Sequence, residues 1–184
     1  MSKENSGLFK GTSGSNATIK TSHKQNLIIS RVTGMDLREH PREKSLTAKQ
    51  KKSVKNKISA RTATRREYKK FESDRRFAER RKEGVKKFWM QERRRILNGE
   101  ITTREWSNKQ KNAILGKKRP SYNGKTIQGH HMFSASKYPH LANRGEVIFP
   151  VTFDEHLYGW HGGNFKTSLP GRPINYSKKH NFGR

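Results

Sequence analysis

Residues 42–97 constrain the fold of this chain more than any other segment, because they contain no proline and only one glycine, Gly84. Proline and glycine are the residues that most disfavour a helix interior. The segment therefore predicts helical structure, and we expect two helices, at roughly 46–60 and roughly 65–97.

Two capping-box patterns mark the starts of these helices. Thr47 is followed three positions later by Gln50, and Thr64 is followed in the same way by Glu67. In such a pair the hydroxyl accepts a free backbone N–H of the first turn, while the longer side chain reaches back to the N–H of the capping residue. The Asn-Gly step at 98–99 is typical of a helix end.

The second expected helix carries one apolar stripe. Apolar side chains recur along it at spacings of three, four and seven, which is the pattern of a helix that buries a single face. These residues are Tyr68, Phe71, Ala78, Val85, Phe88, Trp89 and Ile96. Because the other faces are mostly charged, the stripe predicts a core or a partner interface.

The chain is strongly basic. It has 42 Lys and Arg against 15 Asp and Glu, a formal net charge of +27, so we expect a polyanionic partner and nucleic acid first of all. Only 29% of the residues are apolar and the mean hydropathy is −1.15, which limits the size of the core. Since there is no cysteine, disulfide frameworks and thiolate metal sites are excluded.

No stretch is long and apolar enough to predict a membrane span, and the first residues lack an apolar run of signal-peptide length. We expect a soluble protein without a classical signal peptide, either cytoplasmic or secreted by a specialised system into a target cell. Residues 1–41 are rich in Ser, Gly and Lys, which predicts a flexible arm.

Four of the eight histidines, His130, His131, His156 and His161, lie in one segment near the C-terminus. Neutral imidazole is the commonest protein ligand for divalent transition metals, and a histidine outside the ligand set can move protons. A hydrolytic metal site needs both functions. In a basic chain, this set of histidines indicates a nuclease.

The residues around the histidines predict two short strands followed by a helix. The Asn-Gly step at 123–124 is a frequent hairpin turn and leads toward the strand with the paired histidines. Residues 147–149 are apolar and β-prone, and we expect Pro150 to end that strand. A further capping box at 152–155 predicts the start of a helix that carries His156.

The spacing of the histidines imposes two geometric requirements. His161 lies five positions after His156, so a broken or tightened turn is expected to bring both rings to one metal. His130 and His131 are consecutive, and consecutive strand residues point to opposite faces. We therefore expect this pair at a strand end or a bulge.

The motif Gly129-His130-His131 and the downstream segment 154–164, with the sequence DEHLYGWHGGN, resemble the GHH-signature branch of the HNH/endonuclease VII superfamily of nucleases. Members of this branch are common as C-terminal toxin modules in bacterial polymorphic and contact-dependent toxins. The resemblance covers about residues 106–175.

The resemblance implies a ββα-metal (His-Me finger) module with one divalent ion. By position, it implies the metal ligands His130, His156 and His161. His131 would be the general base that deprotonates the water attacking phosphorus, and the roles of His130 and His131 exchange if the strand twists differently. The central asparagine of the family corresponds to Asn143 or Asn164, of which Asn143 is favoured as the catalytic residue.

The identity of the ion stays open among Mg²⁺, Mn²⁺, Ni²⁺ and Zn²⁺. Three imidazoles suit Zn²⁺, Ni²⁺, Co²⁺ or Mn²⁺ better than Mg²⁺, which prefers oxygen ligands. Many nucleases related by this resemblance nonetheless work with Mg²⁺.

These features together predict an α+β fold. A mostly helical basic region is expected at 42–104, an HNH-like ββα-metal nuclease module at 105–176, and a basic tail at 177–184. The expected phosphate contacts are Lys125, Lys166 and Arg172.

The predicted function is a metal-dependent endonuclease that hydrolyses phosphodiester bonds, in DNA rather than RNA, and acts as a bacterial toxin or effector. An acidic immunity protein is then an expected partner, since it would complement a basic cleft. The alternative is a non-catalytic basic protein for nucleic-acid binding or assembly, in which a metal only stabilises the fold.

Overall fold

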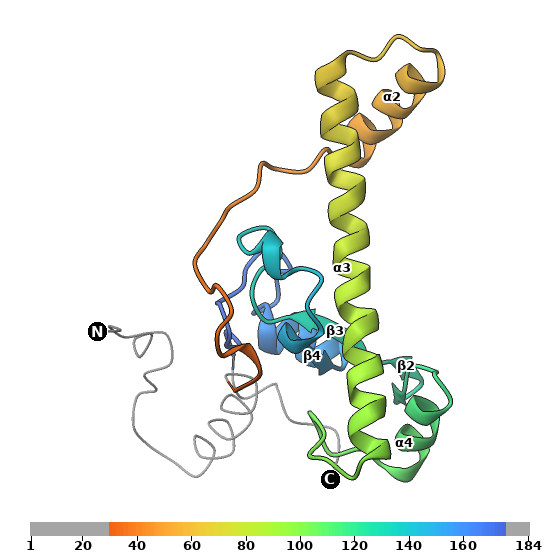
Figure 1. Cartoon of the computed structure of the whole chain (residues 1–184), viewed down its shortest axis with the longest axis vertical. Helices are drawn as coiled ribbons and strands as arrows, with labels where there is room; N and C mark the ends of the chain where they lie inside the picture. The colour runs from red at the N-terminus through yellow and green to blue at the C-terminus, as the bar shows by residue number, and fades with distance from the viewer. Residues whose placement is uncertain (1–29, 176–184) are drawn as a thin grey trace, which may run out of the picture.

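A computed structural model describes residues 30–175 of the chain (Figure 1). The predicted flexible arm up to residue 29 and the predicted basic tail at 177–184 lie outside the described residues. The described part has an α+β fold, which confirms the predicted class.

Three α-helices precede two small antiparallel sheets along the described chain (Figure 1). The helices are α2 (Ala48–Ser59), α3 (Arg65–Leu97) and α4 (Asn108–Leu115). One sheet pairs β1 (Ser121–Tyr122) with β2 (Lys125–Thr126), and the other pairs β3 (Gln128–His131) with β4 (Ile148–Val151). Two 3₁₀ turns, η2 (Pro139–Leu141) and η3 (Gly145–Val147), connect β3 to β4, and a π-helical turn, η4 (Glu155–Trp160), follows β4.

The predicted helix starts are confirmed. Thr47 and Gln50 at the start of α2 bond reciprocally, and so do Thr64 and Glu67 at the start of α3. Helix α3 has the predicted bounds and ends at the Asn-Gly step 98–99. Each of these boundaries is set by side chains within four residues of it, which is why the sequence predicts them well.

The hairpin at the Asn-Gly step is also confirmed. Tyr122 pairs with Lys125, and the two residues between them have positive φ angles, 46° at Asn123 and 75° at Gly124. A two-residue turn of this kind matches the twist of the strands that it joins.

Strand β4 is longer than predicted, and the expectation that Pro150 ends it is wrong. Pro150 lies inside β4, opposite Gly129 of β3. Within residues 30–175, strand β4 pairs only with β3, and a proline without an N–H is tolerated on an edge strand. Val147, which we expected in the strand, belongs to η3 instead.

The apolar stripe of α3 divides into two parts. Phe88 is completely buried in the main core, whereas Tyr68 near the start of the helix is 50% exposed. Figure 1 shows the reason: the N-terminal part of α3 extends away from the sheets and packs against α2. Only the C-terminal half of α3 therefore contributes to the main core.

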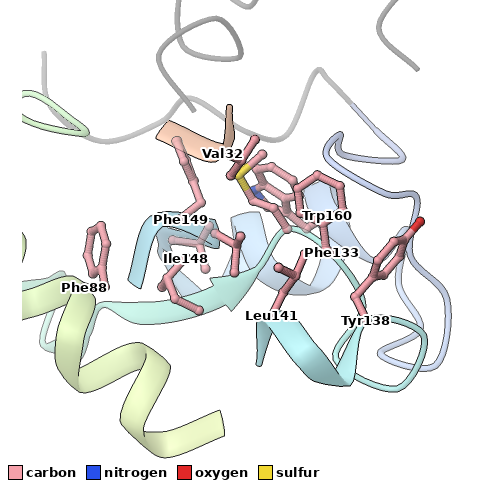
Figure 2. Close-up of a cluster of buried hydrophobic side chains, with 11 residues drawn as sticks. Val32, Phe88, Phe133, Tyr138, Leu141, Ile148, Phe149 and Trp160 are labelled. Atoms are coloured by element: carbon pink, nitrogen blue, oxygen red, sulfur yellow. The ribbon is translucent and has the colours of Figure 1, made fainter. Parts of the chain in front are cut away.

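The main core joins segments that are far apart in the sequence (Figure 2). Phe88 comes from α3, Ile148 from β4 and Trp160 from η4. Val32, 2% exposed, packs into the same core, so residues 30–41 of the predicted arm include a buried contact with the sheet region.

Contacts also cross the predicted boundary between residues 104 and 105. The Arg104 guanidinium donates two hydrogen bonds, of 2.7 and 2.9 Å, to the Glu155 carboxylate, and both side chains are buried. In α3, the buried Glu92 carboxylate accepts bonds from Thr103 and from the indole of Trp106. Helix α3 and the sheet β3–β4 therefore form one packed unit.

Candidate metal centre

Three of the four predicted histidines meet at one point. His130 lies in β3, His156 lies in η4, and His161 follows η4 directly. Their ring centroids are 4.9 to 5.0 Å apart in all three pairs, and one potential ligand atom of each lies within 4.8 Å of the others. This set, called the histidine cluster below, has the ligand types of a divalent transition-metal site.

The chain brings His161 back to His156 through a widened turn. The backbone N–H of His161 donates to the carbonyl of His156, five residues earlier, at 3.1 Å. The expected irregular turn is present and brings the two rings together, but it is widened and not tightened, because a π turn closes one residue later than an α turn. Gly162 and Gly163 follow with φ angles of 59° and 90°, which glycine adopts without strain and which let the chain reverse.

The nitrogen atoms of the cluster fit a bound ion. Nδ1 of His156 donates to the side-chain oxygen of Gln128 at 2.6 Å, and Nδ1 of His161 donates to the carbonyl of Thr167, so each ring keeps a lone pair on Nε2. In metal sites, a ligand histidine commonly donates its other N–H in this way. Nε2 of His130 is buried and has no hydrogen-bond partner within residues 30–175. A divalent ion would satisfy this nitrogen.

Burial favours the neutral form of two cluster residues, His130 and His156. It lowers the pKa of His130 well below the ordinary value, and the neighbouring His156 and His161 lower it further. Burial also lowers the pKa of His156 to about 4, with a further contribution from His161. Neutral imidazole is the form that binds metals, so the lone pairs are available at neutral pH.

His131 has a different environment. It is the last residue of β3, at the strand end that the sequence predicts, and its Nε2 donates to the carbonyl of Ala142 at 2.9 Å. A carbonyl can only accept, so this bond leaves the lone pair of His131 on Nδ1. Burial is the main cause that lowers the pKa of His131 to about 4. The alternation of strand residues thus separates His131 from the cluster ligand His130.

Helix α3 supports the segment that carries Ala142. Arg80 of α3 donates to the carbonyl of His140 at 3.2 Å and to the side-chain oxygen of Asn143 at 2.9 Å. A Cβ atom on Gly84 would lie 2.4 Å from the carbonyl oxygen of Ala142, so glycine is required for this close approach. Packing against α3 therefore fixes the position of the Ala142 carbonyl, which accepts the hydrogen bond of His131.

The other predicted site residues are not part of the cluster. Asn143 is half-buried beside α3, whereas Asn164 is exposed and accepts a bond from the backbone of Lys166. The three predicted phosphate contacts, Lys125, Lys166 and Arg172, are exposed. Lys166 follows Phe165, whose ring lies 5.1 and 5.2 Å from the rings of His156 and His161. The backbone of Lys166 thus directly follows a residue whose ring lies near two cluster histidines.

Sequence reasoning missed several residues that shape this site. Gln128 and Thr167 orient the cluster, and Arg81 of α3 is close enough that its charge, after burial, lowers the pKa of His131. Gln128 stands immediately before the Gly-His-His motif, and that position is a usable signal. Arg81 is one basic residue among many on α3, and only tertiary packing distinguishes it.

Three clustered imidazoles with a fourth, oriented histidine beside them have the composition of a site that can bind a divalent metal and assist hydrolysis. Residues 71–152 match the model of a family described as GHH signature containing HNH/Endo VII superfamily nuclease toxin. The match confirms the resemblance found in the sequence. No curated protein and no solved structure matches the chain.

The extent of the match differs from the predicted extent of about 106–175. It begins at Phe71 and includes most of α3, in keeping with the packing of that helix on the sheet. It contains His130, His131 and Asn143 but ends at Thr152, so His156 and His161 lie beyond it. No helix among residues 30–175 is long and apolar enough to cross a membrane.

Proposed function

We propose that this chain is a metal-dependent endonuclease of the toxin type that hydrolyses phosphodiester bonds in DNA. The observation that carries the proposal is the histidine cluster with the unpartnered Nε2 of His130 at its centre. The description of the matched family as a nuclease toxin supports it independently. In this reading, β3, β4 and η4 form a ββα-metal module.

His130, His156 and His161 would hold one divalent ion. When bound, the ion supplies positive charge that stabilises the phosphate oxygens and the leaving group in the transition state. The hydrogen bonds from His156 to Gln128 and from His161 to Thr167 orient two of the ligands.

His131 would act as the general base. Its Nδ1 accepts a proton from the water molecule that attacks phosphorus. As the ring gains positive charge, its Nε2–H bond to the Ala142 carbonyl becomes charge-assisted and holds the ring in place. Asn143, in the same connection as Ala142, would help to hold this loop in shape through its bond with Arg80.

Cations around the site would bind the substrate. We assign Arg81 to the scissile phosphate, because its charge acts on both His131 and His156. Lys125, Lys166 and Arg172 would contact neighbouring phosphates. A toxin of this type implies an immunity protein, and we propose an acidic one that covers these cations.

Metal removal tests the proposal directly. Purified protein incubated with plasmid DNA should nick or linearise it in the presence of Mg²⁺, Mn²⁺, Ni²⁺ or Zn²⁺, and EDTA should abolish cleavage. His156→Ala, which removes one ligand, should lower metal affinity or activity about 10-fold or more. Tyr158→Phe in the same turn η4, where Tyr158 is 48% exposed, is the matched control and should behave as wild type.

Two outcomes would contradict the metal-dependent endonuclease. Cleavage that persists unchanged in EDTA would exclude the metal mechanism. A metal that raises the melting temperature while neither DNA nor RNA is cut would favour the non-catalytic alternative. A parallel RNA substrate decides the nucleic-acid class, and faster cleavage of RNA would overturn the assignment to DNA.

The phosphate contacts have a separate test by salt titration. In a His131→Ala background, the triple variant Lys125→Ala, Lys166→Ala, Arg172→Ala should reduce the slope of log K against log salt by about 0.9 for each lost phosphate contact. The matched control changes three exposed lysines around α4, Lys109, Lys111 and Lys117, to alanine. If both triple variants gave the same slope of log K against log salt, DNA binding would depend on overall charge and not on these three residues.

A further inference from the structure

A second group of metal-binding side chains lies outside the histidine cluster. Residues 30–41, called the N-terminal segment below, pack on the core through Val32. The segment then runs beside the β3–β4 connection, where the backbone N–H of His40 donates to the carbonyl of Lys137 at 2.8 Å. This docking brings Asp36 and His40 next to His140 of η2. One potential ligand atom of each residue lies within 4.8 Å of the other two.

His140 has the hydrogen bonding of a ligand histidine. Its Nε2 donates to the backbone carbonyl of Asp36 at 2.7 Å, which leaves the lone pair on Nδ1. Nδ1 is buried and has no hydrogen-bond partner anywhere in the described part of the chain. The ion pairs of Asp36 with Arg38 and His40 do not involve this nitrogen. A buried acceptor without a partner destabilises the fold, and a bound metal ion would remove that cost.

The other two residues complete a set of two imidazoles and one carboxylate. Nε2 of His40 lies 2.9 Å from the Asp36 carboxylate, and its ring meets the ring of His140 edge to face at 4.8 Å. The Arg38 guanidinium also binds the Asp36 carboxylate, but the Arg38 side chain is 82% exposed. It can therefore leave the carboxylate without losing packing.

We propose that Asp36, His40 and His140 form a second divalent-metal site, which takes a transition metal such as Zn²⁺ and fastens the N-terminal segment to η2. Two imidazoles and a carboxylate are common Zn²⁺ ligands. The site shares no residue with the histidine cluster and does not depend on the nuclease activity. Turn η2 directly precedes Ala142, whose carbonyl accepts the hydrogen bond of His131. A metal ion at the second site would therefore also hold that carbonyl in place.

Counting bound Zn²⁺ tests the second site. Native mass spectrometry and calorimetric titration of the full chain should find two ions in the wild type, one in His140→Ala, one in His156→Ala, and none in the double variant. In His156→Ala, added Zn²⁺ should raise the melting temperature, and this rise should disappear when His140→Ala is added. The metal-free melting temperature of each variant shows whether it is folded.

Matched variants on the same segment sharpen the test. Asp36→Asn should weaken the second site, whereas Glu39→Gln should leave it unchanged, because Glu39 pairs with Lys137 instead. Arg38→Ala should strengthen Zn²⁺ binding several-fold, since it removes a cation that competes for the carboxylate. A single ion in the wild type that His140→Ala does not affect would overturn the proposal, and so would Zn²⁺ binding that is the same in Asp36→Asn and Glu39→Gln.

Discussion

Replacing His131 by alanine should lower the rate of phosphodiester cleavage by about 10²–10⁴-fold, the usual contribution of a general base. The ring is held by its bond to the Ala142 carbonyl with Nδ1 free to accept a proton, and no other group in the proposed mechanism performs this transfer. Metal binding should be preserved, because His131 is not one of the three cluster residues. Single-turnover cleavage at saturating metal measures the rate, and calorimetry measures the metal affinity.

The paired variant His130→Ala decides between the two roles that the sequence leaves open. It should lose high-affinity metal binding as well as activity, because it removes a cluster ligand. The opposite result, in which His131→Ala loses the metal and His130→Ala keeps it, would exchange the roles of the two histidines. Full activity of His131→Ala would exclude it as the base.

Gly84→Ala should destabilise the fold by about 1–3 kcal/mol, the typical cost of overpacking, and should also reduce cleavage. At an exposed position in a helix, replacing glycine by alanine stabilises the fold by about 1 kcal/mol. A destabilising effect would therefore distinguish a steric clash at Gly84 from the ordinary gain in helix propensity. Here the added Cβ would lie 2.4 Å from the Ala142 carbonyl oxygen, which is backbone and cannot turn away. Moving that carbonyl would disturb the hydrogen bond that holds His131.

Chemical denaturation and cleavage assays on the same preparation measure the two effects of Gly84→Ala. Ser73→Ala, an exposed position earlier in α3, is the control and should be neutral or slightly stabilising. A more stable and fully active Gly84→Ala protein would show that α3 does not set the position of Ala142. Loss of activity at unchanged metal affinity would instead identify Gly84 as a positioning residue for the base.

The features that the sequence predicts well are those set by near neighbours. The starts of α2 and α3 each depend on a capping box of four residues, and the hairpin at 121–126 depends on one Asn-Gly step. The histidine cluster was also visible, because its residues stand in two short motifs with distinctive composition. The expectation that Pro150 ends its strand was wrong, and so was the expectation that the turn before His161 is tightened. In both places the local sequence is compatible with more than one backbone conformation.

Sequence alone therefore determined the helices of the basic region, the two histidine motifs and the family resemblance. Tertiary structure decided that α3 and the sheet share one core, that His130 rather than His131 joins His156 and His161, and that the Ala142 carbonyl orients His131. It also brought Asp36 and His40 to His140. The physical reason is range: caps and turns are hydrogen bonds between residues a few positions apart, whereas these contacts depend on how buried side chains from distant segments fit together.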